Sequence, residues 1–311
     1  EKRIVKKRQF CIYFIHHFFI LSFLINRLND RIRLNKKDFI LFNFKTFSPH
    51  YKLQKWVKSY WIVDYKKIDT NKIQKKIITP YDNICLLFVI NNSKEKICNS
   101  NFPYSNGIYV SPPSMDIQTL ELNSDMYYID VSLYTGVFYK LFGIPISELE
   151  NRLYNIEELS LKFDLSILEI LHDLKGNVSG TINCLNNYLF DIFENFQEDS
   201  LLNNLFQLTK NYNLDEFYLQ NRLSIRQVQR KVKEFTGMNP KDIQRINKFY
   251  HTLTTIKTNK NFLDFGNIAS ENNYYDQSYF IKEFKSFTGL TPKHFLEDAE
   301  NFLQYKCNIF S

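Results

Sequence analysis

The sequence predicts an α+β protein with two domains, an N-terminal all-β barrel-like or sandwich-like domain and a C-terminal all-α domain. Three observations support this fold class. Residues 39–134 contain short runs of β-branched and aromatic residues separated by turn residues. Residues from 136 onward have the three- and four-residue apolar spacing of amphipathic helices. Two C-terminal segments share one pattern, which ends in Thr-Gly-x-x-Pro-Lys.

The N-terminal extension, residues 1–38, differs from the rest of the chain. It carries ten basic and three acidic residues, whereas the whole chain has a formal net charge of +7. Residues 10–25 are free of charge, but this run is shorter than the ~20 residues of a membrane-spanning helix. Three interpretations stay open: a stretch outside the working domain, an extra helix packed on the protein, or a membrane anchor.

Residues 39–160 are predicted to form a β-rich effector or sensor domain. Turn residues such as those of 80–83 and 111–113 separate the strands. A sandwich or small barrel commonly holds a small ligand, so we expect either a ligand-binding or a purely structural role. The expected strands are 39–44, 59–65, 75–80, 84–90, 107–112, 117–122 and 126–134.

Helical patterns follow the predicted strands. Residues 139–153 indicate a short helix, a turn at Pro145 and the start of another helix. Residues 165–176 and 181–196 each present an apolar face, and the first is closed by Gly176. We therefore expect a helical linker over 161–200, a helical domain over 201–299 and a tail over 300–311.

The distribution of reactive side chains argues against an enzyme. The five cysteines are scattered and form no Cys-x-x-Cys pair, which is typical of a reducing compartment, and we expect a cytoplasmic protein. The six histidines lack the spacing of a metal site. No nucleophile elbow, phosphate-binding loop or zinc-protease motif occurs. We expect no catalytic residue, no metal and no cofactor.

The C-terminal region carries an approximate duplication. Residues 224–242 match residues 276–294, and a continuous helical pattern over 245–261 lies between them. In each unit the second helix has an apolar stripe that we expect to face inward. The inward residues are Ile225, Val228, Val232 and Phe235 in unit one, and Phe280, Phe284 and Phe287 in unit two.

The outward faces of these two helices carry side chains suited to DNA. Five basic residues and no acidic residue lie between Arg222 and Lys233. Arginine can bond guanine, glutamine can bond adenine, and lysine can contact phosphates. We expect Ile281 to face outward as well. The predicted DNA-binding residues are Arg226, Gln227, Gln229, Arg230, Lys233, Gln277, Ser278, Lys282 and Lys285.

Residues 201–299 resemble the DNA-binding domain of the AraC/XylS family of bacterial transcription regulators. The resemblance is most specific at Ile268-Ala269, at Asp276-Gln277-Ser278-Tyr279-Phe280 and at Gly289-Leu290-Thr291-Pro292. It implies two helix-turn-helix units joined by a long helix, which enter successive major-groove segments. Base contacts are carried over onto Arg226, Gln229 and Arg230, and onto Gln277, Ser278 and Lys282.

Unit one departs from the family pattern. Tyr218 stands where a small alanine is usual, and Arg222 stands where a turn glycine is usual. In unit two, Asn273 replaces a glycine, and asparagine tolerates the left-handed conformation. The departures in unit one keep an alternative function open, an interaction or docking protein whose helix-turn-helix domain no longer reads DNA.

The N-terminal half has a more diffuse resemblance, to the all-β domain attached to one group of AraC-type regulators. It is carried by Leu53-Gln54-Lys55-Trp56, by the 80–83 turn and by Phe142-Gly143-Ile144-Pro145. We expect a sequence-specific transcription regulator whose partners are double-stranded DNA, RNA polymerase, a small-molecule effector and a second copy of the chain.

Overall fold

A computed structural model describes residues 42–65, 74–90, 97–99, 102–122, 126–198, 200–211, 213–258 and 264–302. The predicted N-terminal extension and most of the predicted tail lie outside these ranges. No helix within them is long and apolar enough to cross a membrane.

A six-stranded antiparallel sheet forms the centre of the β-rich region, with strand order β1-β2-β9-β4-β7-β10. Two further pairs, β3–β8 and β5–β6, form separate two-stranded sheets. Hydrogen bonding among the described strands leaves the large sheet open, so the region is a layered sheet structure and not a closed barrel. The strands are β1 (Phe42–Phe47), β2 (Val57–Tyr65), β3 (Gln74–Ile78), β4 (Ile84–Val89), β5 (Ile97–Asn99), β6 (Phe102–Tyr104), β7 (Gly107–Ser111), β8 (Gln118–Leu122), β9 (Met126–Leu133) and β10 (Tyr154–Asn155).

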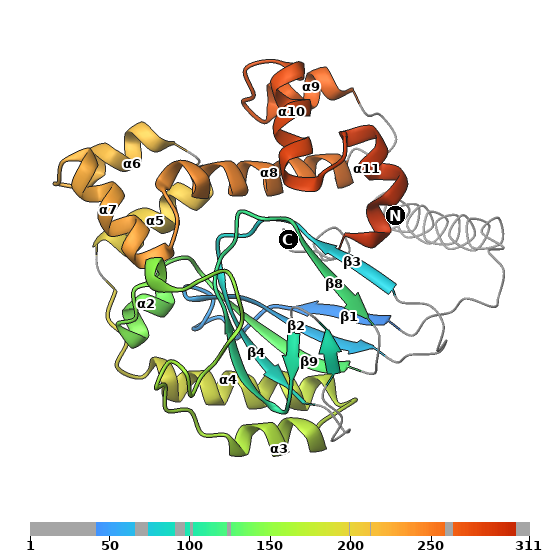
Figure 1. The fold of residues 1–311 in the computed structure, drawn as a ribbon. Helices are drawn as coiled ribbons and strands as arrows, with labels where there is room; N and C mark the ends of the chain where they lie inside the picture. Colours follow the sequence, from blue (N-terminus) through green and yellow to red (C-terminus); the bar gives the residue numbers. More distant parts are fainter. Residues whose placement is uncertain are drawn as a thin grey trace, which may run out of the picture. The chain divides into compact units, whose positions relative to one another are not determined.

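Both faces of the large sheet are covered, which explains why β4 reads as one continuous apolar run. All six residues of β4 are buried. On one face Leu86 and Phe88 pack in a core with residues of helices α3 (Ser166–Asp173) and α4 (Val178–Phe193), which Figure 1 shows along this face. On the other face Leu87 and Val89 join a smaller core with Leu120 of β8.

The sequence located most of these elements and missed three. β5, β6 and β10 have only two or three residues each, too short to show an apolar alternation. The first strand is described over Phe42–Phe47, which continues past the expected end at residue 44, and residues 39–41 of the expected strand lie outside the described ranges. The helix expected after Pro145 is a single 3₁₀ turn, η1 (Ile146–Glu148), preceded by α2 (Val137–Phe142).

The C-terminal region is helical throughout its described part. Its core is rich in phenylalanine, and Phe249, Phe280, Phe284 and Phe295 are fully buried. The expected linking helix exists, but it begins at Pro240, earlier than the 245–261 pattern indicated. The elements are α5 (Ser200–Asn211), α6 (Leu214–Gln220), α7 (Ile225–Thr236), α8 (Pro240–Thr258), α9 (Phe265–Glu271), α10 (Gln277–Thr288), α11 (Pro292–Asp298) and η2 (Ala299–Asn301).

Side-chain contacts join the β-rich and helical regions. The Tyr139 ring of α2 stacks on Phe235 of α7 with centroids 4.2 Å apart. The Tyr250 hydroxyl of α8 donates to the Pro80 carbonyl at 2.9 Å, and the Asn247 amide donates to Asp82 at 2.7 Å. The C-terminal end of α7 and the middle of α8 are therefore covered, whereas the N-terminal turn of α7 is exposed.

Candidate nucleic-acid interface

Unit one consists of α6, a short turn and α7, and side-chain caps define both helix starts. Asn213 accepts a hydrogen bond from the Glu216 amide at the start of α6. Ser224 and Gln227 form a capping box on α7, in which each side chain accepts from the other residue's backbone N–H. These bonds satisfy donors that a helix start leaves unpaired, so the chain must turn at Ser224.

Unit two, α9 and α10, repeats this construction with different residues. Asp264 accepts hydrogen bonds from the Gly266 and Asn267 amides, and Asp276 accepts one from the Tyr279 amide at 2.7 Å. An aspartate cap also places negative charge at the positive end of the helix.

The shared Thr-Gly sequence has the same structural role in both units. The Thr236 hydroxyl lies 2.7 Å from the Val232 carbonyl and accepts from the Met238 amide at 3.1 Å. Thr288 repeats both contacts one unit later, with the carbonyl of Phe284 and the amide of Leu290. The glycine that follows each threonine is left-handed, with φ of 72° at Gly237 and 75° at Gly289. The motif therefore ends α7 and α10 in the same way.

The turns inside the two units differ by one residue, which explains why unit one can have Arg222 in its turn. Asn221 and Asn272 are buried, and each donates its amide to the carbonyl four residues earlier. From Asn272 the chain reaches its next cap in four residues through Asn273, whose φ is 56°, whereas from Asn221 it takes three. Among the described residues other than glycine only Ser160 and Asn273 have positive φ, so Arg222 does not need the conformation of the glycine it replaces.

Helix α8 fixes the second unit by side-chain bonds along its length. The Arg245 guanidinium forms two bonds with the Glu283 carboxylate of α10, at 3.0 and 3.1 Å. Hydrogen bonding to Glu283 raises the pKa of Arg245. Lys248 donates to the carbonyl of Asn273, and His251 bonds Asn272 at 2.7 Å. Burial lowers the pKa of Lys248. The linking helix thus positions both the turn of unit two and α10.

All nine residues predicted to bind DNA are exposed on α7 or α10. The basic members, Arg226, Arg230, Lys233, Lys282 and Lys285, make no ion pair with any part of the chain that the structure describes. The structure brings each set together on one helix surface and leaves its charges available to a polyanion.

Two of the predicted residues already have partners within unit one. The Gln227 carbonyl oxygen accepts from the Ser224 amide at 3.0 Å in the capping box. The Gln229 amide donates to the Tyr218 hydroxyl at 3.3 Å. Tyr218 is half-buried between α6 and α7, where it takes the space of the expected alanine. A base contact from either glutamine would require its present bond to break.

The inward stripe of α7 is shorter than predicted. Val228 and Val232 are fully buried and Phe235 is 8% exposed, but Ile225 is 56% exposed. The interpretation of Ile225 as a core residue was wrong, because it is the first residue of α7 and extends beyond the core that begins at Val228. Ile281, expected outward, is half-buried and packs against the helical core.

Sequence reasoning also overlooked exposed apolar side chains beside α7 and α10. Leu219, Leu223 and Tyr275 are 85%, 39% and 93% exposed. Their positions in the sequence could have predicted this exposure, since Leu223 and Tyr275 each stand directly before a helix-capping residue.

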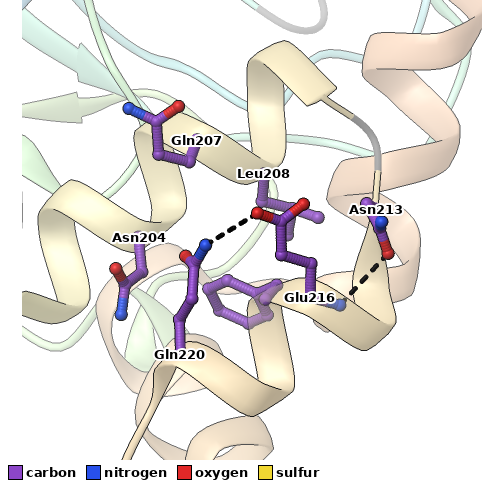
Figure 2. Close-up of a pocket in the computed structure, with 7 residues that line it drawn as sticks. Asn204, Gln207, Leu208, Asn213, Glu216 and Gln220 are labelled. Carbon is purple, nitrogen blue, oxygen red and sulfur yellow. Dashed lines mark hydrogen bonds between the residues drawn. The ribbon is translucent and has the colours of Figure 1, made fainter.

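A shallow, open hollow lies between α5 and α6, and Figure 2 shows its lining of polar side chains together with Leu208 and Phe217. The Gln220 amide donates to Glu216 at 3.0 Å along one side. This hollow lies in the helical region, not in the β-rich region to which an effector was assigned. No group of three or more His, Cys, Asp or Glu within the described ranges could hold a metal ion.

Known protein families and structures are only distantly similar to this chain. The model of a domain of unknown function, DUF6597, matches residues 45–155. No curated protein sequence matches the chain. An apo lysine-to-alanine variant of ToxT from Vibrio cholerae strain SCE256 is 13% identical with a TM-score of 0.43, covering 76% of this chain and 97% of that chain. Wild-type ToxT of the same strain, bound to an unsaturated fatty acid, is 14% identical with a TM-score of 0.36, covering 83% and 94%. This likeness is too low to assign a function.

Proposed function

We propose that this protein is a sequence-specific DNA-binding transcription regulator that inserts α7 and α10 into neighbouring segments of the major groove. The observation that carries this proposal is the structural duplication. Two recognition helices have the same cap positions and the same Thr-Gly ending, and each presents exposed cations without a described acidic partner. The AraC/XylS resemblance supports the same conclusion.

The two kinds of exposed side chain have different roles in the proposal. Lysines such as Lys233 and Lys282 supply affinity by contacting phosphates, which displaces counterions and depends on salt. Arg226 and Arg230 discriminate between bases, because a guanidinium can form two bonds to a guanine edge. Replacing Arg230 with alanine should weaken binding to a selected site by about 1–3 kcal/mol relative to a mismatched site.

The decisive experiment is fluorescence anisotropy of the full chain on random-sequence duplex DNA across a salt series. The variant Arg226→Ala/Arg230→Ala/Lys233→Ala removes three charges from α7. Each lost phosphate contact reduces the slope of log affinity against log salt by about 0.9. Because random-sequence DNA does not offer the two arginines a selected guanine, they can contact phosphates there as Lys233 does, so we expect a slope shallower by about 1 to 3.

The matched control removes three exposed lysines from outside the helix-turn-helix units, in the variant Lys52→Ala/Lys55→Ala/Lys162→Ala. It has the same net charge as the α7 variant and should keep the wild-type slope. Equal losses in both variants would indicate a non-specific charge effect, and no binding by the wild type at low salt would refute the proposal.

The docking alternative has one observation in its favour, the 85% exposure of Leu219 at the end of α6. It requires that DNA binding be absent, so the same titration decides between the two functions. A small-molecule effector in the β-rich region, contact with RNA polymerase and a homodimer stay predictions, as do the residue assignments.

A further inference from the structure

Large apolar side chains are exposed at the N-terminal ends of both recognition helices. Ile225 is the first residue of α7 and is 56% exposed, and Leu223 beside it is 39% exposed. Tyr275 comes directly before the cap of α10 and is 93% exposed. Leaving such side chains in water forgoes the free energy of burying them.

The local structure keeps these side chains out of the protein core. A hydrophobic residue before a helix cap often packs on the fourth helical residue. In this chain the fourth residues, Val228 and Phe280, are fully buried within the helical core. Tyr275 has no hydrogen bond or ring contact with a described residue. Tyr279 is less available, because its ring centroid lies 6.4 Å from that of Tyr274.

The residues around Leu223 and Ile225 indicate what kind of surface covers these two side chains. Arg222 and Arg226 flank Leu223 and Ile225, and both are exposed. Since no acidic residue lies between Arg222 and Lys233, the neighbouring charge is suited to a polyanion. The C5-methyl of thymine is the apolar group that a base presents in the major groove, and the N-terminal residues of a recognition helix reach base edges.

We infer that Ile225 and Tyr275 contact thymine methyl groups, and that each recognition helix therefore prefers a thymine next to the bases its polar side chains read. This inference rests on the proposed function. It adds one specificity-determining residue to each unit, both outside the set predicted from the sequence.

The test begins with duplexes selected from a random library by the full chain. The selected duplex is then made with uracil in place of each thymine in turn, which removes only the methyl group. Burial of one methyl corresponds to about a four-fold change in affinity. We expect one thymine in each half of the site to show a loss of about this size by anisotropy at fixed salt.

Alanine variants assign each methyl to a residue. Ile225→Ala should bind the thymine and uracil duplexes equally at one position, and Tyr275→Ala at the other. Ile225→Ala keeps a good helix former, and both side chains are exposed, so the fold should be retained. Leu219→Ala, which removes an exposed leucine outside the recognition helices, should keep both uracil penalties.

The outcomes separate the two proposals. Salt-dependent binding without a uracil penalty, or a penalty that persists in both alanine variants, overturns the inference and leaves the proposed function standing. Failure to select any preferred sequence also overturns the inference. Absence of DNA binding at low salt overturns the proposed function and the inference together.

Discussion

Replacing Asp130 with asparagine should change the free energy of unfolding of the β-rich region in a pH-dependent way. The difference between the variant and the wild type should be more favourable to the variant at neutral pH than at acidic pH. Asp130 lies in β9 and is 6% exposed. The Ser132 hydroxyl donates a hydrogen bond to its carboxylate at 3.0 Å. Burial raises the pKa of Asp130 to about 6, from an ordinary value of 3.8.

The sign follows from the direction of this change. Because the folded-state pKa lies above the unfolded one, the folded protein binds the proton more tightly. Proton binding to Asp130 stabilises the folded wild type fully below the unfolded-state pKa, and this stabilisation is lost as pH rises through about 6. The interval between the two values, at about 1.4 kcal/mol for each pH unit, amounts to about 3 kcal/mol.

The neighbouring titratable groups do not change charge in this interval. Burial raises the pKa of the Cys85 thiol, which lies 3.7 Å from Ser132, well above its usual value. Burial likewise raises the pKa of Tyr81. Both groups stay neutral, and Lys58 is the cation whose charge acts on Cys85. The pH-dependent difference between Asp130 and asparagine therefore belongs to the carboxylate.

Urea unfolding followed by tryptophan fluorescence measures the effect where it occurs. Both tryptophans, Trp56 and Trp61, lie in the β-rich region, and Trp61 pairs with Asp130 across β2 and β9. The free energy of unfolding of Asp130→Asn minus that of the wild type should rise by about 3 kcal/mol between about pH 3 and about pH 8. Thr119→Ala, an exposed neutral change in β8, should show no such trend. A flat or falling difference for Asp130→Asn would refute the reasoning.

Two further substitutions test the construction of the helical region. Thr288→Val leaves the Leu290 amide without its acceptor, so it should lower the free energy of unfolding by about 1–3 kcal/mol in urea titrations followed by circular dichroism. Thr288→Ser should recover most of this loss, and a loss in Thr288→Ser without one in Thr288→Val would mean that the methyl and not the hydroxyl matters. Ser224→Ala removes one half of the α7 capping box and should cost about 1 kcal/mol in the same assay. Ser286→Ala, an exposed serine inside α10, should cost less, and the reverse order would exclude a capping role for Ser224.

The elements that could be predicted from the sequence are those whose pattern is local. β4 is visible as an apolar run, and the Thr-Gly endings mark where the two recognition helices stop. The exposure of all nine predicted residues followed from helical periodicity, since opposite faces of a helix differ by fixed spacing. Short elements such as β10 carry no signal, because pairing with β7 and not composition makes them strands.

By itself, the sequence determined the order of β-rich and helical regions, the duplication of the helix-turn-helix pattern and the charge of its outer faces. Only the tertiary structure decided that Ile225 is exposed, that Gln227 is held in a capping box and that Arg245 holds α10 through Glu283. The physical reason is the range of the interactions. Caps and periodic faces depend on residues within one or two helical turns, whereas burial at a helix end and ion pairs between helices depend on what the rest of the chain places beside them.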